Sequence, residues 1–495
     1  MGRAVVPLLI QRGHVVRLLA RGAEKEALRY LHGVEAVPAD VADAEQLAGV
    51  PEGCDAVVHL AGIVDEQPPA TTFARVNHAG TRNLLAAAEQ AGAPRFVFLS
   101  SLGADRGETD YHRSKLAAEE SVRAYAGPWV ILRPGNVYGP GDDTVSRLFQ
   151  LARTLPAVPL VGDGRQPFQP LWHRDLAEVI AQTVEREDLR GRTLELAGPE
   201  VTNTEDLLRR FAAITGQKPA SMKLSPAVAG WTTGALEWFG AAGRRWLAGH
   251  GLPTPITATK LRLLLEANVL PAEAANALEE EFSLTPTSLQ EGLAQLMREL
   301  PPQLAGDGVG AVHHAEYWAE IDGSRVTAPE LLRWVGRHLA DVMPVAVDLL
   351  PEVDATEPGR LLTLRLPGGR RAPVRVVERT AGAVTFIALE GHPLAGFVRL
   401  TSEAEGTSVR FAVHVVAQPA NVVEQMAFRP FGRFLQEAGW RNLVRHVVTL
   451  SGGRSVRSVR RRLYPRGDDK TAALRAEIEQ LVRAAEVAAS TAGAS

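Results

Sequence analysis

Strand-like and helical patterns alternate along the first 200 residues, and this alternation limits the fold more than any other feature of the sequence. Runs of β-branched and aromatic residues predict buried strands at residues 15–19, 57–61, 95–99 and 129–132. Apolar side chains at helical spacing predict helices between them, at residues 78–91 and 111–125. This alternation predicts βαβ units and a parallel sheet in an α/β fold. Ligands bind such sheets at the carboxyl ends of the strands, so the residues after each strand are candidates for a functional site.

The chain is longer than one hydrophobic core usually organises, so its 495 residues predict two or three domains. We expect the α/β part to span residues 1–300, with a mostly helical last third that includes helices at residues 204–215 and 257–265. The Pro- and Gly-rich segment 301–310 predicts a linker. A helix, several alternating segments and a long final helix predict an antiparallel α+β domain over residues 311–453. An arginine-rich hinge and a C-terminal helix are expected over residues 454–495.

Composition excludes several classes of protein. The formal net charge of −3 gives no reason to expect nucleic acid as a partner. Cys54 is the only cysteine in the sequence, which rules out an internal disulfide and metal sites built on paired cysteines, so a cytoplasmic location is expected. The sequence contains no apolar stretch of about 18 residues, so we expect no membrane-spanning helix.

Tyr111 and Lys115 carry the most informative chemistry in the sequence. Four residues apart on a predicted helix, their side chains share one face. A lysine cation there favours the phenolate and lowers the tyrosine pKa, which suits a tyrosine to act as an acid or base near neutral pH. The motif follows a predicted strand that ends in Ser100 and Ser101, whose hydroxyls are able to hydrogen-bond a substrate carbonyl. This order predicts proton transfer at a carbonyl or an alcohol.

The ordered set resembles the extended short-chain dehydrogenases/reductases, the superfamily of NAD-dependent epimerases and dehydratases. The motifs that carry the resemblance are Ser100-Ser101, Tyr111-x-x-x-Lys115, Arg133-Pro134-Gly135-Asn136-Val137-Tyr138-Gly139-Pro140, His59-Leu60-Ala61-Gly62, Val76-Asn77-x-x-Gly80-Thr81, Gly162-Asp163-Gly164 and His173-Arg174-Asp175-Leu176-Ala177. The resemblance covers residues 2–300 and implies a Rossmann-type, doubly wound parallel sheet. It implies that Tyr111 is the catalytic acid/base, that Lys115 lowers its pKa and holds the nicotinamide ribose, and that Ser101 polarises the carbonyl.

The end of the second strand of this fold selects the nicotinamide cofactor. A carboxylate there accepts hydrogen bonds from the adenosine ribose and indicates NAD. This chain has Arg21 instead, which is able to pair with a 2′-phosphate, so NADP(H) is favoured over NAD(H), with a plain surface arginine as the alternative. By the resemblance, Asp40 and Val41 lie near the adenine, and Asn77 supports a proton path. The other positions expected at the cofactor are Ala61, Gly62, Lys115, Pro134, Gly135 and Asn136.

The beginning of the chain departs from the family pattern. The family opens with a strand and a Gly-x-x-Gly-x-x-Gly turn, whose backbone amides and following helix hold the pyrophosphate. Gly2 is expected to be the third of these glycines, and residues 4–11 the helix behind it. In this interpretation the first strand of the sheet is missing from the sequence, and codons upstream of Met1 are expected to encode it.

The segment between Ser101 and Tyr111 is about ten residues long, shorter than the substrate-side loop of the epimerases. In this respect, and over residues 257–268 and 282–293, the chain resembles an atypical branch that contains the nucleotide-binding accessory subunit of respiratory complex I. Some members of that branch are thought to bind a nucleotide structurally and not to turn it over. The short segment therefore favours a binding protein over an enzyme.

Residues 311–453 resemble START-like helix-grip proteins, in which a curved antiparallel sheet wraps a long helix around an apolar cavity. The resemblance rests on the order of strands and on a predicted turn at residues 390–396. It implies an apolar ligand. No metal is expected, because His313, His314 and His392 lack the spacing and carboxylate partners of a metal site. Core packing explains the apolar stripe of the last helix, Met426, Phe428, Phe431, Phe434 and Trp440.

Three functions stay open. The first is an NAD(P)(H)-dependent oxidoreductase or epimerase-like enzyme that acts on a small carbonyl or alcohol substrate, and the complete set of Ser101, Tyr111 and Lys115 favours it. The second is a non-catalytic nucleotide-binding accessory or assembly protein, similar to the complex I subunit. The third is a protein that binds an apolar, lipid-like molecule through residues 311–453.

Overall fold

The structure is a computed structural model that describes residues 1–27, 30, 32–154, 157–215, 219–225, 266, 268–339, 346–348, 356–366, 371–422, 424–425, 432–456, 459–465 and 467–492. The helix predicted at residues 257–265 lies outside these residues, as do Met426, Phe428, Phe431 and the side chain of Phe434. Of the described residues, those up to Met297 form one compact unit and those from Arg298 form another.

Parallel strands form the centre of the N-terminal unit. Four of them make one ladder in the order β3 (Ala56–His59), β4 (Arg95–Leu99), β5 (Trp129–Pro134) and β9 (Arg192–Leu196). A separate parallel ladder pairs β1 (Val16–Ala20) with β2 (Val34–Pro38), and within the described residues no pairing joins β1 to β3. The Rossmann-like parallel sheet predicted from the alternation is confirmed, and β4 has the predicted bounds.

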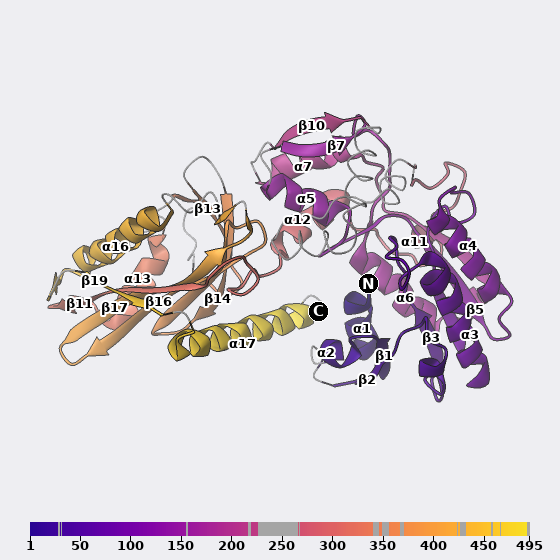
Figure 1. The fold of residues 1–495 in the computed structure, drawn as a ribbon, viewed down its shortest axis with the longest axis horizontal. Helices are drawn as coiled ribbons and strands as arrows, with labels where there is room; N and C mark the ends of the chain where they lie inside the picture. The colour runs from indigo at the N-terminus through magenta and orange to yellow at the C-terminus, as the bar shows by residue number, and fades with distance from the viewer. Residues whose placement is uncertain are drawn as a thin grey trace. The chain divides into compact units, whose positions relative to one another are not determined.

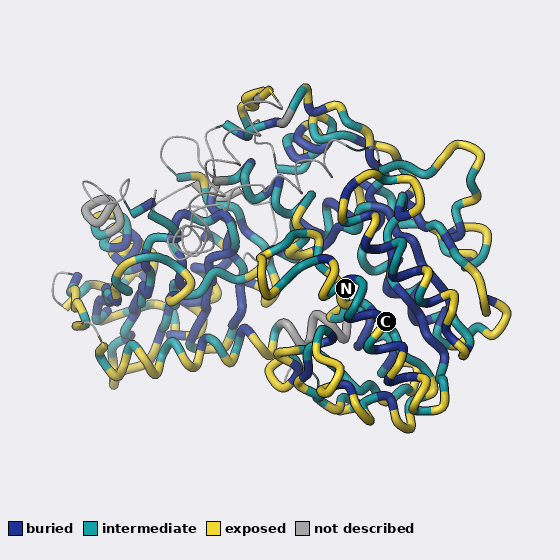
Figure 2. Tube along the Cα trace, turned by 45° about the vertical axis from the view of Figure 1, so that its right-hand side comes forward, coloured by how far each residue is buried: buried dark blue, intermediate teal, exposed yellow. Residues whose placement is uncertain are grey.

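Helices cover both faces of this sheet (Figure 1). Helices α1 (Gly2–Gln11) and α6 (His173–Glu185) pack on one face, and α3 (Gly80–Gln90) and α4 (Asp110–Arg123) pack on the other. Successive residues of β4 alternate between the two cores, with Val97 facing the first pair of helices and Phe96 and Phe98 facing the second. Most residues of β4 and β5 are buried, which explains their apolar sequences, and Figure 2 shows buried segments of chain, in dark blue, within this unit.

A second group of elements follows the carboxyl ends of β5 and β9. Its members are β6 (Val137–Tyr138), α5 (Val145–Thr154), β7 (Ala157–Val161), β8 (Leu171–Trp172), α7 (Thr204–Thr215), β10 (Ala220–Leu224), α11 (Ala277–Glu280) and α12 (Leu289–Arg298). Phe149, Phe211 and Leu293 bring α5, α7 and α12 into one core. The helix predicted at residues 204–215 is confirmed as α7. The short helix α2 (Ala23–Ala27) follows β1.

The C-terminal unit contains an antiparallel sheet with the order β12-β13-β14-β15-β16-β17-β11, and both β18 and β19 pair with β11. The strands are β11 (His313–Asp322), β12 (Ala346–Asp348), β13 (Leu361–Arg365), β14 (Arg371–Arg379), β15 (Ala383–Ala388), β16 (Leu394–Glu405), β17 (Ser408–Pro419), β18 (Arg454–Ser455) and β19 (Arg460–Tyr464). The predicted turn at residues 390–396 lies between β15 and β16 and extends into the first residues of β16.

Helices α13 (Ala328–Arg337) and α16 (Gly432–Leu450) pack on one face of this sheet, where Val335, Trp440 and Val444 meet residues such as Phe411. Helix α17 (Asp469–Ala492) lies on the opposite face (Figure 1), with Ile478 and Val482 buried. The antiparallel sheet and its long helix agree with the α+β pattern of the sequence. A START-like arrangement around an apolar cavity stays a prediction.

Two connecting segments differ from the sequence prediction. The hinge expected from residue 454 onward instead forms β18 and β19. The arginine side chains of β19 make contacts on both faces of the sheet. Arg460 pairs with Glu320, and Arg461 pairs with Glu437. Arg462 lies over the ring of Trp318. The segment 301–310 is not a free linker, since its backbone bonds to β15, β16 and the end of β17.

Two kinds of feature are absent from the described residues. No helix there has the length and apolar character that a membrane span requires. No group of three or more His, Cys, Asp or Glu side chains in that part of the chain is arranged to hold a metal ion. His314 and His392 instead hydrogen-bond Thr471 and the backbone of Leu394.

Candidate active site

Helix α4 places three ionisable side chains on one face. It begins after Thr109, whose hydroxyl accepts a hydrogen bond from the backbone N–H of His112 and caps the first turn. Tyr111, Lys115 and Glu119 follow at intervals of four residues, which places their side chains on the same side of the helix. All three make contacts with residues at the end of β4, the edge of the sheet where α/β proteins bind ligands.

Lys115 is buried at this edge. It is 5% exposed, and its Nζ donates a hydrogen bond of 2.9 Å to the carbonyl oxygen of Leu99, the last residue of β4. The ammonium also lies 5.0 Å from the centroid of the Phe98 ring, within the range of a cation–π interaction. Burial lowers the pKa of Lys115 to about 8, and the charge of Glu119 opposes this shift. Lys115 is therefore mainly a cation at neutral pH and loses its proton just above it.

Tyr111 lies one helical turn before Lys115 and contacts Ser101, the second residue after β4. Burial raises the pKa of the Tyr111 phenol, and a hydrogen bond with Ser101 opposes the rise. The ring packs edge to face against Phe73, with centroids 6.0 Å apart. The expectation of a lowered tyrosine pKa is therefore wrong, because the loss of hydration of the phenolate outweighs the hydrogen bond.

A π-helical turn, Ala74–Ala79, places Asn77 between the loop after β3 and helix α4. The Asn77 side chain donates from Nδ2 to the Ile63 carbonyl oxygen and to Ser114 Oγ, both at 3.0 Å, and its Oδ1 accepts from the Ile63 N–H at 2.8 Å. Ser114 donates in turn to the Tyr111 carbonyl oxygen at 2.7 Å. π-helical turns are frequent at functional sites. This one connects the end of β3 to the residue that carries the phenol.

Ala61 and Gly62, predicted to lie at the cofactor ribose, are exposed after the end of β3. A Cβ atom on Gly62 would lie 3.1 Å from Lys115 Nζ and 3.5 Å from Asn77 Oδ1. Glycine therefore keeps a side chain out of the space next to an ammonium and an amide. Hydrogen-bonding groups of this kind fit the hydroxyls of a nicotinamide ribose, so the residues present fit the cofactor that the sequence predicts.

Four other predicted cofactor positions lie on α1 and on the β1–β2 ladder. Gly2 begins α1, Arg21 is exposed after β1, and Asp40 and Val41 follow β2. Val41 is buried, and a Cβ atom on Gly80 would lie 2.9 Å from its Cγ2, so the start of α3 approaches this loop closely. Arg21, Asp40 and Val41 are thus at the ends of a different ladder from the strand that precedes Ser101, and Gly2 lies at the start of a helix.

Pro134, Gly135 and Asn136 lie at the carboxyl end of β5, as predicted. Their backbone groups are hydrogen-bonded to neighbouring segments, through Leu102, Leu196 and Asn268. A Cβ atom on Gly135 would lie 2.9 Å from the carbonyl oxygen of Gln169, so a larger residue does not fit there. The three residues therefore join the end of β5 to the elements that follow it.

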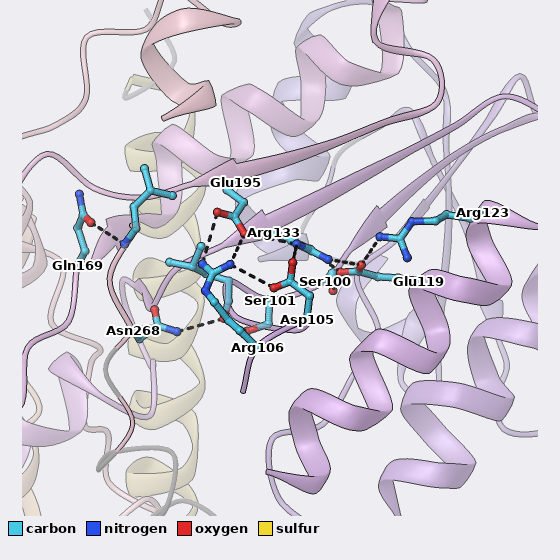
Figure 3. A network of polar contacts seen from close by, with 12 residues as sticks. Ser100, Ser101, Asp105, Arg106, Glu119, Arg123, Arg133, Gln169, Glu195 and Asn268 are labelled. Carbon is cyan, nitrogen blue, oxygen red and sulfur yellow. Dashed lines mark hydrogen bonds and ion pairs between the residues drawn. The ribbon is translucent and has the colours of Figure 1, made fainter. Parts of the chain in front are cut away.

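The structure also contains a buried charged network that sequence reasoning missed. Glu119 is 0% exposed and lies between Arg123 and Arg133 (Figure 3). Arg133, near the end of β5, donates two hydrogen bonds to the carboxylate of Glu119, at 2.9 and 2.7 Å. Burial acts to raise the pKa of Glu119, but hydrogen bonds from Arg133 and Ser100 outweigh it, and the pKa is below its usual value. Glu119 is therefore a buried carboxylate.

The same network reaches the short segment between Ser101 and Tyr111. Arg133 pairs with Asp105 at 2.5 Å, and Arg106 pairs with Glu195 of β9 at 2.8 Å (Figure 3). Two signals in the sequence point to this network. Glu119 continues the four-residue spacing of the tyrosine and the lysine, and Arg133 is a charged residue at the end of an apolar strand.

This fold and site are those of the nicotinamide-dependent short-chain dehydrogenases/reductases, and comparison with known proteins identifies the family. Residues 1–197 match the NAD dependent epimerase/dehydratase family. Ceramide reductase of Caulobacter vibrioides is 30% identical over 295 residues, an alignment that covers 57% of this chain and 87% of the relative. The chain therefore belongs to the NAD-dependent epimerase/dehydratase family, as its motifs predicted.

Two further relatives differ in what they are named for. A 3 beta-hydroxysteroid dehydrogenase/Delta 5-->4-isomerase of Mycobacterium tuberculosis is 29% identical over 291 residues, which cover 52% of this chain and 76% of the relative. NADH dehydrogenase (ubiquinone) 1 alpha subcomplex subunit 9, a mitochondrial protein of Arabidopsis thaliana, is 28% identical over 232 residues, which cover 45% of this chain and 58% of the relative. The chain is thus similar both to NAD(P)-dependent oxidoreductases and to a complex I subunit.

Proposed function

We propose that the N-terminal unit is an NADP(H)-preferring oxidoreductase that reduces a carbonyl group of an apolar substrate. The observation that carries the proposal is the arrangement around α4, where the Tyr111 phenol hydrogen-bonds Ser101 and the buried Lys115 lies one turn further on. Tyr111 is the acid/base, Lys115 stabilises its phenolate and binds the nicotinamide ribose, and Ser101 hydrogen-bonds the substrate oxygen.

The protonation states of Tyr111 and Lys115 suit the steps of a carbonyl reduction. Because burial raises the pKa of Tyr111, the phenol carries its proton at neutral pH and is suited to act as an acid. A reduced nicotinamide, held by residues that include Lys115, would supply the hydride that such a reduction needs. Tyr111 donates its proton to the substrate oxygen, the resulting phenolate is stabilised by the Lys115 cation, and water then returns the proton. This sequence of proton transfers favours reduction of a ketone or aldehyde to an alcohol.

An aromatic residue beside Tyr111 supports an apolar substrate. Phe73 contacts the phenol ring, with ring centroids 6.0 Å apart. One relative is named as a ceramide reductase, and another is named as a 3 beta-hydroxysteroid dehydrogenase/isomerase. We therefore place lipid-like ketones ahead of nucleotide sugars as candidate substrates.

The preference for NADP(H) rests on Arg21. The residue is exposed at the end of β1, where a guanidinium is able to pair with the 2′-phosphate of the adenosine ribose. Asp40 and Val41 follow the neighbouring strand β2 and would contact the adenine. The proposal predicts that binding of NADPH exceeds that of NADH in a titration followed by cofactor fluorescence.

The test is a turnover assay with NADPH and a panel of ketones. The panel contains a ceramide-like ketone, a ketosteroid, simple aldehydes and a nucleotide sugar, and oxidation of the cofactor is followed by absorbance. Reduction of a lipid-like ketone that disappears in Tyr111→Phe supports the proposal. Tight NADPH binding without turnover of any compound would overturn it.

That last result would support the second candidate, a nucleotide-binding accessory protein. The relative in complex I favours this alternative, as does the short segment between Ser101 and Tyr111. In that case the raised pKa of Tyr111 has no role in catalysis, and the phenol ring serves packing against Phe73. Turnover, and not cofactor binding, distinguishes the two candidates.

A further inference from the structure

Two side chains on neighbouring turns of α4 hold consecutive residues at the end of β4. Lys115 donates to the carbonyl oxygen of Leu99 at 2.9 Å, and Glu119 accepts from the hydroxyl of Ser100 at 2.6 Å. The next residue along the chain is Ser101, the hydrogen-bond partner of Tyr111. The helix that carries the phenol therefore also determines where the residue beside the phenol lies.

Glu119 occupies a position that is unfavourable for a carboxylate unless it is fully paired. It is 0% exposed, and the partners of its two oxygens are Ser100, Arg123 and Arg133. Apolar residues of similar volume often stabilise a protein as well as a buried ion pair does, so such a pair is weak evidence for a role in stability alone. The bond from Ser100 to this carboxylate is the link that leads to the Tyr111 site.

Ser100 itself is buried and hydrogen-bonded to Glu119. It is 5% exposed, and its hydroxyl donates to Glu119 and not toward Tyr111. Of the two hydroxyls that end the strand, only that of Ser101 lies at the phenol. The two neighbouring serines therefore differ in their surroundings, one beside a buried carboxylate and the other beside the acid/base.

We infer that Ser100 and Glu119 are positioning residues of the Tyr111 site, which hold the end of β4 against α4 so that Ser101 stays hydrogen-bonded to the phenol. This inference rests on the proposed function. In this role neither residue needs to touch the substrate or the cofactor, since both act through Ser101. Arg133 compensates the charge of Glu119 and connects it to Asp105, so the loop after Ser101 is held by the same network (Figure 3).

The inference predicts a specific change in the ionisation of Tyr111. The hydrogen bond with Ser101 acts to lower the pKa of the phenol, so displacing Ser101 raises that pKa further. The proton donor is then misplaced relative to the substrate oxygen. A displacement of about 1 Å is able to reduce turnover by about a hundredfold, so a partial displacement should reduce kcat by about tenfold with little change in KM or in cofactor affinity.

The experiment compares Ser100→Ala with Ser121→Ala. Ser121 lies on the same helix and donates only to the carbonyl oxygen of Ala117, at 3.1 Å, so its variant makes the same chemical change without touching the network. Tyrosinate absorbance is titrated against pH for each variant, and the same titration of Tyr111→Phe is subtracted to isolate the phenol of Tyr111. We expect ionisation at higher pH and about tenfold lower kcat in Ser100→Ala, and no change in Ser121→Ala.

Glu119→Gln separates the hydrogen bond from the charge. Glutamine still accepts from Ser100, but the charge that acts against deprotonation of Lys115 is gone, so the alkaline fall of kcat moves to lower pH. Glu119 and His59 are the titratable groups whose charges act on Lys115, and His59 stays neutral because burial lowers its pKa to about 3. If Glu119→Gln does not fold, Ser100→Ala decides the question.

The outcomes separate this inference from the proposed function. An unchanged Tyr111 titration together with unchanged kcat in Ser100→Ala would overturn the positioning role. Unchanged turnover in Tyr111→Phe would overturn the proposed function instead. The absorbance titration needs no substrate, so it tests the positioning of Ser101 even if every ketone of the panel fails.

Discussion

Both units bury charged side chains on a sheet, but at different places along the strands. In the N-terminal unit, Glu119 of α4 meets Arg133 near the carboxyl end of β5, next to Ser100. In the C-terminal unit, a polar row crosses five antiparallel strands on the face that α17 covers. Its members, each paired in register with the next, are Glu316, His414, Arg399, Thr385 and Glu378.

The partners of the two sets also differ. In the C-terminal row, Arg410 pairs with Glu316 at 2.6 Å and Arg399 pairs with Glu378 at 2.8 Å, and these arginine side chains are 29% and 15% exposed. Arg133 is 8% exposed. The row therefore lies within strands, with arginines that are more exposed than Arg133, whereas Glu119 and Arg133 lie at strand ends near Tyr111. Buried charge alone therefore does not indicate a functional site. A position at the carboxyl end of a parallel strand does.

Removal of Arg133 has the largest expected effect. Arg133→Met leaves Glu119 buried with its main partner gone, so we expect a loss of about 3–5 kcal/mol in the free energy of unfolding of the N-terminal unit. In Arg410→Met of the second unit, Glu316 keeps the hydrogen bond from the Tyr464 hydroxyl and the removed arginine is more exposed than Arg133, so we expect a smaller loss. Hydrogen exchange of peptides from β5 and from β17 measures the two units separately. Equal losses would remove the distinction drawn between them.

Tyr111→Phe has the next largest effect. Loss of the acid/base reduces kcat by about a hundredfold, or about 2.7 kcal/mol in activation free energy, while NADPH binding stays nearly intact because the ring still packs on Phe73. The matched control is Tyr464→Phe, which removes a hydroxyl that donates to Glu316 at 2.8 Å in the C-terminal unit. The control should leave kcat unchanged. A similar fall of kcat in both variants would contradict the assignment of Tyr111.

Arg21→Asp tests the cofactor preference. Loss of a charge-assisted pair with the 2′-phosphate weakens NADPH binding by about ten- to a hundredfold and leaves NADH binding nearly unchanged. Arg454→Asp makes the same charge reversal at an exposed position of β18 and serves as the control. Fluorescence titration gives both dissociation constants. An equal loss of affinity for NADPH and NADH would show that Arg21 does not bind the 2′-phosphate.

The smallest effect is a dependence on pH. Because Lys115 has a pKa of about 8, its cation is present below that pH and is lost above it, so kcat for reduction should be halved at about pH 8 and fall by about tenfold for each further unit. His414 and Arg399 of the second unit have no part in this profile. Lys115→Arg keeps its charge and should lose the alkaline fall at a lower overall kcat. An alkaline fall that persists in Lys115→Arg would assign it to another group.

The features that the sequence predicted are local ones. The strand at residues 95–99 and the helix at 204–215 have the predicted bounds, because each is a short segment with one periodicity and clear ends. Tyr111 and Lys115 were found because their spacing lies within one helix. The raised pKa of Tyr111 was not predicted, since it depends on burial by residues far along the chain, such as Phe73.

The features that the sequence missed depend on pairing between distant segments. Glu119 and Arg133 come from different elements, and charged residues are rarely buried unless they are paired, so neither was expected in a core. The arginines of β19 were expected in a solvated hinge for the same reason. Their partners Glu320 and Glu437 lie more than twenty positions away in the sequence, on β11 and α16.

The π-helical turn Ala74–Ala79 has a consequence for how this chain tolerates change. A π-turn contains one residue more than an α-turn, and each helical residue rotates the chain by about 100°. Deleting a single residue there would turn Asn77 away from Ile63 and Ser114 while leaving the hydrophobic pattern almost the same. Substitutions at the exposed Ala74 and Arg75 keep the number of residues in the turn, and therefore the direction in which the Asn77 side chain points, unchanged. In this turn the number of residues is therefore under tighter constraint than the identity of most of them.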